Sequence, residues 1–465
     1  MYDGNCPCFE AAAQRKTIPV LEIGFGVLIV KWAWLFPIVR LRPSATRGVD
    51  AAMKKLILFS LCVVVLIGCR TVPHEQTVTT RDAVRYDAGL PVVYLSGTPY
   101  EIGYQHGAIL RDKVREHYAN VFAYLDTMPR VRVLPRWQVN WELDEIWDDL
   151  VPYMPADYLE EMRGLSDASG VSLMAIHRAH AIPDAFPTQC SNGAFWGNAT
   201  MGGQFLQFRN LDWSRKLGVH NYACVFVVSP KGKHSFVNLG FIGFIGTLSG
   251  MNDRGIAVGQ VGSRSADEWH KGTSFIFLLR RVLEEADNVD AGARIVRDAP
   301  RTVGINYLIG SAIEKKALAL EATAHHFAEF HDADPAEARS PYAVPLTNAV
   351  FRADTAFDPA VRDQQTCSKG DPKTPGLEDP HGNSAYDRRY LGQADMVKAN
   401  YGRITTNEVF ALAKKIAMKS NIQSVVYAYP EFWVAYAKDD LRAADCDYHH
   451  FNLQELLSKK KEPHP

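Results

Sequence analysis

The chain has 465 residues, of which 47% are hydrophobic and 22% are charged, so it can bury a sizeable core in one large domain or two smaller ones. Its 51 lysines and arginines nearly balance its 52 aspartates and glutamates. Binding driven by a net charge of one sign is therefore excluded, and we expect no nucleic-acid partner.

A membrane-targeting signal is predicted at residues 53–69. A basic start at Met53 is followed by an apolar run over 56–67, which ends in Gly68-Cys69. This pattern resembles a bacterial lipoprotein signal, in which the small glycine permits cleavage and Cys69 carries the lipid. A plain transmembrane anchor is the alternative, although the run is short for a span of about 20 residues. We expect a lipid-anchored protein of the bacterial cell envelope, either periplasmic or at the outer membrane.

Residues 1–52 precede this complete signal and contain another apolar stretch over 19–39. We interpret 1–52 as a mis-assigned upstream extension, with translation starting at Met53. A genuine first membrane helix is the alternative. Residues 70–90 are polar and are predicted to tether the folded part to the lipid.

The folded part is predicted to begin with a mainly helical segment at 91–189. Residues 91–95 have the character of a strand, a helix follows from 97 to about 126, and apolar residues recur at helical spacing over 137–182. His106 lies in the first helix, where we expect a packing or capping role.

A β-hairpin is predicted next, from two segments at 190–198 and 204–213 that flank a turn of small residues. Cys190 opens the first strand, and Arg209 and Asp212 lie on the second. A thiol, a guanidinium and a carboxylate could therefore meet at one end of a sheet. The alternative is a buried cysteine with a surface arginine and aspartate, because free cysteines are mostly small core residues.

Short strands and helices alternate up to residue 440. Strands are predicted at 222–228, 234–239, 246–250, 255–261, 306–311, 317–322, 424–429 and 431–437. Helices are predicted at 274–286, 291–298, 388–401 and 406–418. The residues 352–383 are predicted to form a long surface loop, and 441–465 a polar C-terminal tail. This order fits two stacked antiparallel sheets between helix layers.

The Cys-Ser-Asn start at 190–192, followed by Phe-Arg-Asn-Leu-Asp-Trp at 208–213, resembles the cysteine N-terminal-nucleophile (Ntn) hydrolases. These include the penicillin acyltransferase-like peptidases, the choloylglycine hydrolases and relatives of acid ceramidase. The pattern Tyr-Glu-x-Gly-x-Gln-x-Gly at 100–107 is similar to the segment upstream of the nucleophile in the penicillin acyltransferase-like family.

The resemblance covers roughly residues 90–440 and implies an α+β fold, the four-layer αββα sandwich of two antiparallel sheets between helix layers. In such proteins the helical segment, here 91–189, is a pro-segment that remains as a separate small subunit after self-cleavage. Residues 190–440 would then form the catalytic domain.

The resemblance also implies that the chain cuts itself between Gln189 and Cys190. Cys190 would then own both a thiol and an α-amine, whose pKa near ~8 lets it accept the thiol proton. The implied reaction cleaves the C–N bond of a linear acyl-amide through a thioester, by hydrolysis or by acyl transfer, without a cofactor. Two alternatives remain open, which are a lipase-like or phospholipase-like ester hydrolase and an inactive envelope lipoprotein that binds acyl ligands.

Four further residues match positions of the family's site. Asp212 matches the carboxylate that holds the α-ammonium and Arg209 the arginine near the thiol, with a structural salt bridge between them as the alternative. Asn252 resembles an asparagine that stabilises the oxyanion, although its Asn-Asp-Arg-Gly context also makes a good hairpin turn. Asn348, in Leu-Thr-Asn, matches the other expected donor.

A second arginine of the site is implied by residues 384–390, which resemble the family signature Ser-x-x-Arg-Tyr. The two adjacent arginines leave the register open between Arg388 and Arg389. We choose Arg389 because it directly precedes the aromatic Tyr390. The residues after Asn348 depart from the family pattern, so the substrate preference is not transferred.

The remaining cysteines and the aromatic residues suggest structural roles. Cys224 is predicted to lie in the core, while Cys367 and Cys446 could form a disulfide. No cysteine or histidine spacing indicates a metal site, and none is predicted. Aromatic residues near the nucleophile indicate an apolar acyl pocket or ordinary core. They are Phe195, Trp196, Trp213, Phe241 and Phe244.

Overall fold

The computed structural model describes six stretches of the chain, which are residues 84–87, 89–127, 136–186, 188–339, 343–366 and 385–459. All of them belong to the unit Val78–Pro465. The predicted extension at 1–52 and the predicted signal at 53–69, with its lipidation site Cys69, lie outside these stretches. Where the chain is described, none of its helices is long and apolar enough to cross a membrane.

The segment before the hairpin begins with two strands. Val84–Asp87 (β1) pairs antiparallel with Leu90–Gly97 (β2). The tether predicted at 70–90 is therefore wrong at its C-terminal end, because β1 adds to a sheet.

Helices follow β2, as the apolar periodicity predicts. They are α3 (Pro99–Ile109), α4 (Arg111–Leu125), α6 (Arg136–Leu150), α7 (Ala156–Ser169) and α8 (Leu173–Ala185). Thr98 and Glu101 form a capping box that starts α3. A Cβ atom on Gly103 would lie 1.8 Å from the carbonyl oxygen of Glu161, so only glycine lets α3 pack this closely on α7. This contact explains the first glycine of the 100–107 motif.

The first sheet has nine strands among the described residues, in the order β1-β2-β5-β6-β7-β8-β9-β10-β11. The strands not yet named are β5 (Ala223–Pro230), β6 (Phe236–Phe241), β7 (Gly250–Asn252), β8 (Ile256–Gly262), β9 (Ile305–Ser311), β10 (Lys316–Ala322) and β11 (Phe327–Phe330). The prediction of purely antiparallel sheets is wrong at one pair, because β2 runs parallel to β5. The two strands are far apart in sequence, with five described α-helices and the whole hairpin between them, so no short turn sets their direction.

The second sheet contains the predicted hairpin and has the order β12-β3-β4-β13-β14-β15. Its strands are β3 (Gln189–Gly197), β4 (Gly203–Asp212), β12 (Ala349–Arg352), β13 (Asn421–Ala428), β14 (Glu431–Tyr436) and β15 (His449–Asn452). The polar tail predicted at 441–465 is wrong in its middle, because β15 pairs with β14 and continues into α14 (Leu453–Lys459). Phe451 and Leu453 are buried there.

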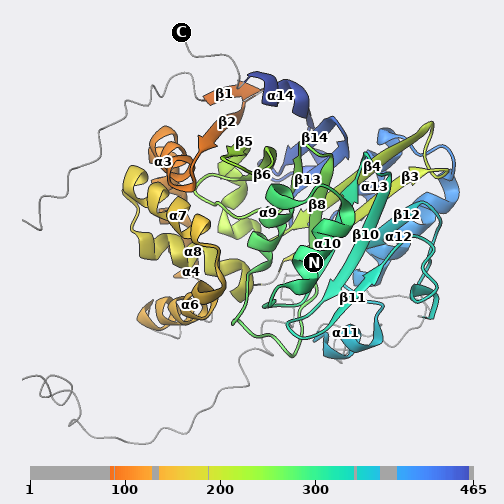
Figure 1. Ribbon diagram of the computed structural model, residues 1–465, viewed down its shortest axis with the longest axis horizontal. Coiled ribbons are helices and arrows are strands. Elements are labelled where there is room, and N and C mark those ends of the chain that lie inside the picture. Colours follow the sequence, from red (N-terminus) through yellow and green to blue (C-terminus); the bar gives the residue numbers. More distant parts are fainter. Residues whose placement is uncertain are drawn as a thin grey trace, which may run out of the picture. The chain divides into compact units, whose positions relative to one another are not determined.

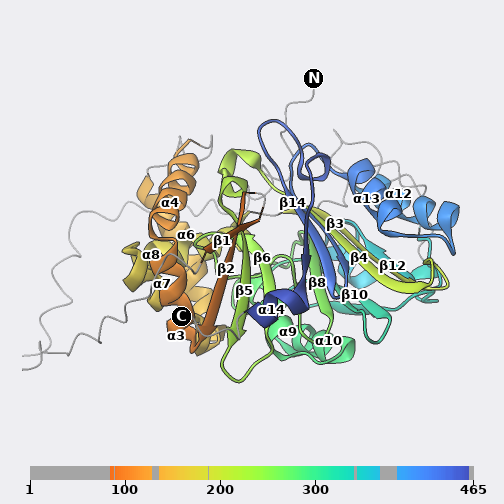
Figure 2. The same cartoon turned by 90° about the horizontal axis from the view of Figure 1, so that it is seen from above.

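The two sheets lie face to face between helices (Figures 1 and 2). The helices of the second half are α9 (Phe275–Glu285), α10 (Val289–Asp298), α11 (Pro359–Gln364), α12 (Ala385–Asn400) and α13 (Thr406–Ile416). Helices α9 and α10 pack on the first sheet, α12 and α13 pack on the second, and β8 contacts β3 between the sheets. All seven residues of β8 are buried, because a helix covers one face of the strand and the other sheet covers its opposite face. The predicted four-layer αββα sandwich is confirmed.

The surface loop predicted at 352–383 is wrong over its first half. Residues after β12 turn inward, and Asp354, Ala356 and Val361 are all buried. The chain reaches α11 there before it leaves the described part at residue 366. The suggested disulfide between Cys367 and Cys446 is not formed, because Cys446 is a free thiol that donates to the carbonyl oxygen of Arg442 at 3.4 Å. Cys367 itself lies outside the described residues, and Cys224 is buried in the core as predicted.

Candidate active site

The β3–β4 hairpin places a thiol and a guanidinium on one face of the second sheet. Its turn uses Gly202 and Gly203, whose φ angles of 69° and 68° favour glycine. Asn192 pairs with Arg209, and residues directly opposite each other share a face. Cys190 lies two positions before Asn192 on the same face, so its thiol is a diagonal neighbour of the arginine.

The thiol of Cys190 is fully buried and has three polar neighbours. Its Sγ lies 3.4 Å from Nη2 of Arg209, 3.8 Å from Oγ1 of Thr188 and 3.9 Å from Nε2 of Gln260. Burial raises the pKa of the Cys190 thiol, and the positive charge of Arg209 opposes this increase. The arginine is thus the group that favours thiolate in an otherwise unfavourable place.

Arg209 is held in position by hydrogen bonds to two side chains and to one backbone carbonyl group. Its Nη1 donates to Oγ of Ser249 at 3.0 Å and to Oε1 of Gln423 at 3.4 Å. Its Nε donates to the carbonyl oxygen of Gln260 at 3.4 Å. Ser249 in turn donates to Gln423 at 2.6 Å, so the guanidinium is fixed where it meets the thiol.

Arg389, on α12, joins the backbone of the nucleophile to two carboxylates. Its Nη1 donates to the carbonyl oxygen of Cys190 at 2.7 Å and to Oδ2 of Asp212 at 3.2 Å, and its Nη2 pairs with Oδ2 of Asp354. The structure thereby brings four of the predicted site residues together, which are Cys190, Arg209, Asp212 and Arg389. The ion pair of Asp212 is with Arg389, and the side chain of Arg388 lies outside the described part of the chain.

Asp354 is a site residue that the sequence analysis missed. Its Oδ1 accepts a hydrogen bond from the backbone nitrogen of Cys190 at 3.4 Å. Burial raises the pKa of Asp354 to about 7, although Arg389 acts in the opposite direction. Burial likewise raises the pKa of Asp212, again opposed by Arg389. The only available signal was strand register, because β12 continued beyond Arg352 would set residue 354 opposite residue 190.

Asn252 serves the turn between β7 and β8 and not the thiol. Its Nδ2 donates to the carbonyl oxygens of Leu283 and Ala286, both at 3.0 Å. Its Oδ1 accepts from the backbone nitrogens of Arg254 and Ile256. Both amide hydrogens are therefore committed, so the predicted oxyanion role is wrong and the hairpin-turn alternative holds.

Replacing Asn252 with alanine is expected to lower stability and to leave the chemistry intact. The change would leave two buried carbonyls and two backbone N–H groups without this partner, each costing about 1–3 kcal/mol if water does not replace it. Urea unfolding should report the lost free energy, and activity per folded molecule should stay unchanged. Selective loss of activity at unchanged stability would restore the oxyanion role.

Asn348 lies at the opposite end of β3 from Cys190. Its carbonyl oxygen accepts from the nitrogen of Trp196, and its Oδ1 accepts from the nitrogen of Asn198, both at 3.0 Å. Six residues of strand separate Cys190 from Trp196, which is roughly 20 Å at about 3.3 Å per residue. The prediction of Asn348 as an oxyanion donor is therefore wrong, and the residue shapes the end of the hairpin with a φ of 58°.

His106 has the packing role that the sequence predicted. It is buried, and its Nε2 accepts a hydrogen bond from the nitrogen of Gly243 at 2.8 Å. Burial lowers its pKa to about 3, so the ring is neutral and can accept this bond. His180 accepts from the nitrogen of Ile245 in the same way, so two histidines of the helical segment hold the loop after β6.

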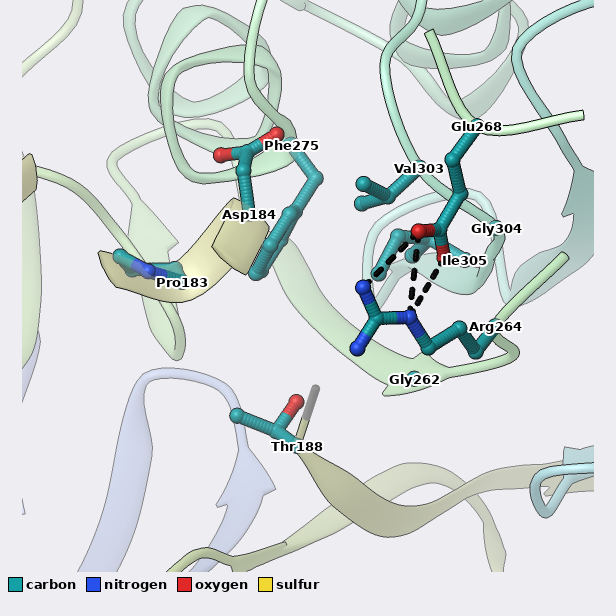
Figure 3. A pocket seen from close by; sticks show the side chains of 10 residues that line it. All are labelled: Pro183, Asp184, Thr188, Gly262, Arg264, Glu268, Phe275, Val303, Gly304 and Ile305. Atoms are coloured by element: carbon teal, nitrogen blue, oxygen red, sulfur yellow. Dashed lines mark hydrogen bonds and ion pairs between the residues drawn. The ribbon is translucent and has the colours of Figure 1, made fainter. Parts of the chain in front are cut away.

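A small cavity of about 10 Å³ adjoins Thr188, next to the Gln189–Cys190 bond (Figure 3). Asp184 lies on one side of it, and the ion pair of Arg264 with Glu268 lies on another, with Nε–Oε1 at 2.9 Å. Asp184 accepts hydrogen bonds from Ser274 and from Thr302, and burial raises its pKa to about 6. A space of this size suits one water molecule.

A second cavity, of about 40 Å³, is almost entirely apolar and lies between the helical segment and the sheets. Its lining includes Tyr118, Val121, Ile182, Trp213, Phe241, Phe244 and Leu248. Trp213 directly follows Asp212, and Leu248 directly precedes Ser249, which bonds Arg209. Two of the lining residues are thus sequence neighbours of residues at the site. Of the aromatics named from the sequence, Phe195 and Trp196 lie instead in a separate core cluster.

Within the described residues, no group of three or more His, Cys, Asp or Glu side chains is arranged to hold a metal ion. The charged groups around the thiol are two arginines and two aspartates, and they are engaged with one another and with the nucleophile's backbone. The arrangement can favour the thiolate form of Cys190 through Arg209, and it can accept or donate a proton at the backbone nitrogen of Cys190 through Asp354.

Comparisons with known proteins agree with the motifs. Residues 199–334 match the family described as acyl-coenzyme A:6-aminopenicillanic acid acyl-transferase. Protein dcd1B of Dictyostelium discoideum is 27% identical over 262 residues, which are 52% of this chain and 52% of that protein. The N-acylethanolamine-hydrolyzing acid amidase of Rattus norvegicus is 20% identical over 245 residues, which are 48% of this chain and 60% of that protein.

Among solved structures, the Caenorhabditis elegans ortholog of N-acylethanolamine-hydrolyzing acid amidase covers 51% of this chain and 92% of its own, with a TM-score of 0.36 and 12% identity. The match to dcd1B spans only about half the length of either chain. The family match covers residues 199–334, which include Arg209 and Asp212 of the hairpin motif. The predicted resemblance to the penicillin acyltransferase-like group is confirmed over this part of the chain.

Proposed function

We propose that this protein is a self-processing cysteine amidohydrolase or acyltransferase that cleaves the C–N bond of an acyl-amide with an apolar acyl group. The observation that carries the proposal is the contact of Cys190 Sγ with Arg209 Nη2 at 3.4 Å, in a residue whose backbone carbonyl oxygen accepts from Arg389 and whose backbone nitrogen donates to Asp354. An inert core cysteine needs neither a buried cation at its sulfur nor ion-paired groups on its backbone.

Self-processing follows from the position of Cys190 in the chain. Its sulfur is fully buried while the Gln189–Cys190 bond is intact, so a substrate cannot reach it. Cleavage of this bond frees the preceding residues to withdraw, and it converts the backbone nitrogen of Cys190 into an α-amine. The new amine, with a pKa near ~8, accepts the thiol proton at neutral pH.

The catalytic cycle then uses the groups around Cys190. The thiolate attacks the carbonyl carbon of the substrate amide, and the N–H groups of Gln260 Nε2 and Arg209 Nη2, which are nearest to the sulfur, stabilise the negative oxygen. The α-ammonium returns its proton to the leaving nitrogen as the C–N bond breaks. Water or an acceptor amine finally displaces the thiol from the thioester.

The apolar cavity beside Trp213 and Leu248 supports an apolar acyl group. Its lining residues come from helices of the segment before Cys190 and from loops after it, so both fragments of a cut chain would build it. A relative that matches part of this chain is an amidase that hydrolyses N-acylethanolamines, which also carry an acyl group on an amide.

The test combines intact mass with a graded substrate panel. Purified full-length protein is expected to consist of two fragments that meet between Gln189 and Cys190. N-acyl amides of increasing acyl length should then show kcat/KM rising by roughly fourfold per methylene, which corresponds to about 0.8 kcal/mol per buried CH₂, until the pocket is filled. Esters with the same acyl groups are tested beside the amides, and the class that the protein cleaves distinguishes an amidase from an ester hydrolase.

Two results would contradict the proposal. One is a preparation that stays a single uncut chain and yet turns over amides, because the buried thiol would then not be the nucleophile. The other is a cut protein whose kcat/KM is indifferent to the apolar length of the acyl group, because the cavity would then not hold that group.

A further inference from the structure

Asp354 touches the one atom that changes from amide to amine during self-cleavage. Its Oδ1 accepts from the backbone nitrogen of Cys190 at 3.4 Å, and its side chain is 6% exposed. The strand β12 leaves the sheet at Arg352, so this carboxylate takes the place of the backbone carbonyl that would otherwise pair with Cys190. The contact lies outside the sequence motifs that indicated the site.

The backbone that carries Asp354 is built to hold it there. Nδ2 of Asn306 on β9 donates to the carbonyl oxygen of Ala353 at 3.0 Å. Nε2 of Gln365 donates to the carbonyl oxygen of Asp354 at 2.9 Å, and Oε1 of the same glutamine accepts from the nitrogen of Ala356 at 3.0 Å. Two buried amide side chains thus fix the turn on both sides of the carboxylate.

The uncut chain lacks the α-amine that would accept the thiol proton in the mature enzyme. Before cleavage the nitrogen of Cys190 is an amide, which is too weakly basic to accept the thiol proton. When the bond to Gln189 breaks, the same nitrogen leaves as an amine and must receive a proton. A base that later acts as an acid, placed at that nitrogen, would meet both needs.

Charge balance in the buried site favours a carboxylate for this task. Arg209 and Arg389 carry two positive charges, and Asp212 and Asp354 carry two negative charges, so the cluster is neutral while the thiol is protonated. A thiolate formed by losing its proton to water would leave an uncompensated buried charge, which is costly. Moving the proton from the sulfur to a carboxylate of the same cluster keeps the net charge of the cluster at zero.

We propose that Asp354 relays the proton of the Cys190 thiol to the backbone nitrogen of Cys190 during self-cleavage. The proposal rests on the self-processing proposed above. The sulfur and the nitrogen belong to one residue, so rotation about the Cα–Cβ bond of Cys190 brings the thiol toward a carboxylate that already meets the nitrogen.

During self-cleavage one proton leaves the thiol of Cys190 and reaches the backbone nitrogen of the same residue. The thiol proton moves to Asp354, and the Sγ–C bond to Gln189 forms. The C–N bond then breaks, and Asp354 returns the proton to the departing nitrogen, which becomes the α-amine. Water hydrolyses the resulting thioester, which gives the C-terminal carboxylic acid of Gln189 and regenerates the thiol.

The relay predicts how self-cleavage depends on pH. The charged or titratable groups that face Asp354 are Arg389 on α12, Asp212 on β4 and Cys190 on β3. Burial raises the pKa of Asp354 to about 7, so the carboxylate is protonated below that pH and cannot accept the thiol proton. The rate of self-cleavage should therefore fall as the pH drops below about 7.

The experiment measures the rate of self-cleavage in freshly refolded full-length chains by intact mass. Asp354→Asn keeps the size and the hydrogen-bond acceptor but cannot carry a proton, so cleavage should slow by about 10²–10⁴-fold. Asp354→Glu keeps the carboxyl group and should retain measurable cleavage. Asp363→Asn, which removes an exposed negative charge from α11, serves as the matched control and should cleave like the wild type.

The outcomes separate the relay from the proposed function. If the wild type and Asp354→Asn cleave at equal rates, the relay is wrong and the self-processing enzyme stands. If the wild type does not cleave, both are wrong. Should Asp354→Asn fail to fold, the wild-type profile decides, because a rate that is constant from about pH 5 to about pH 8 excludes a relay through this carboxyl group.

Discussion

The Cys190→Ala variant is expected to remain uncut at the peptide bond that follows Gln189 and to lack amide-cleaving activity. The substitution removes the atom that attacks both the Gln189 carbonyl and the substrate, so maturation and turnover should be lost together. Removing a nucleophile costs about 10⁶-fold in rate in well-studied hydrolases. Intact mass reports the missing cut, and hydrolysis of the best amide of the panel reports the missing activity.

The matched control for this variant is Cys224→Ala. Both cysteines are fully buried in β-strands, and both substitutions remove one sulfur atom from the core. Each should cost a similar amount of stability, typically about 1 kcal/mol. Only Cys190→Ala should stop cleavage. If Cys190→Ala is still cut, another residue must be the nucleophile, and the proposed function loses its basis.

The sequence predicts the part of the site that lies on one hairpin. Cys190, Arg209 and Asp212 are close in sequence, and a glycine turn sets their strands in register, so local pattern alone brings them to one end of the sheet. Arg389 comes from a distant helix, and only the motif indicated it. The structure supports that choice over Arg388 because the guanidinium of Arg389 meets both Asp212 and Cys190.

The errors concern residues whose partners lie far away in the sequence. Asn252 fits the family motif, but its side chain is bound to the end of α9, which no local pattern could reveal. Asn348 fits as well, but the register of β12 on β3 carries it to the far end of the strand. Asp354 lies in a stretch rich in loop-forming residues, so a buried role was not expected there.

The layers of the fold could be predicted from local patterns, whereas strand pairings between distant segments could not. Alternating strands and amphipathic helices indicate the layers, since each sheet and each helix must bury its apolar face. The parallel pairing of β2 with β5 and the edge strand β15 depend on long-range pairing. Both therefore differ from what the sequence predicts.

Replacing Arg389 with methionine is expected to stop self-cleavage and to destabilise the protein by about 3–5 kcal/mol, the usual cost of leaving buried charges without a partner. The guanidinium is shared by Asp212 and Asp354, and it also binds the carbonyl oxygen of Cys190. Its loss leaves two buried carboxylates facing each other and removes the hydrogen bond that holds the backbone carbonyl of the attacking residue, Cys190.

The pH dependence of this defect tests the cause. Without the arginine, the pKa values of Asp212 and Asp354 rise further above their unfolded values of about 3.9, so the folded variant must bind protons that the unfolded chain releases. Its stability therefore falls as the pH rises from about 4, and the deficit against the wild type should be smaller at about pH 5 than at about pH 8. Urea unfolding at both pH values measures it. Arg388→Met removes the same charge from the neighbouring position of α12, and an equal defect there would mean that the site does not depend on Arg389.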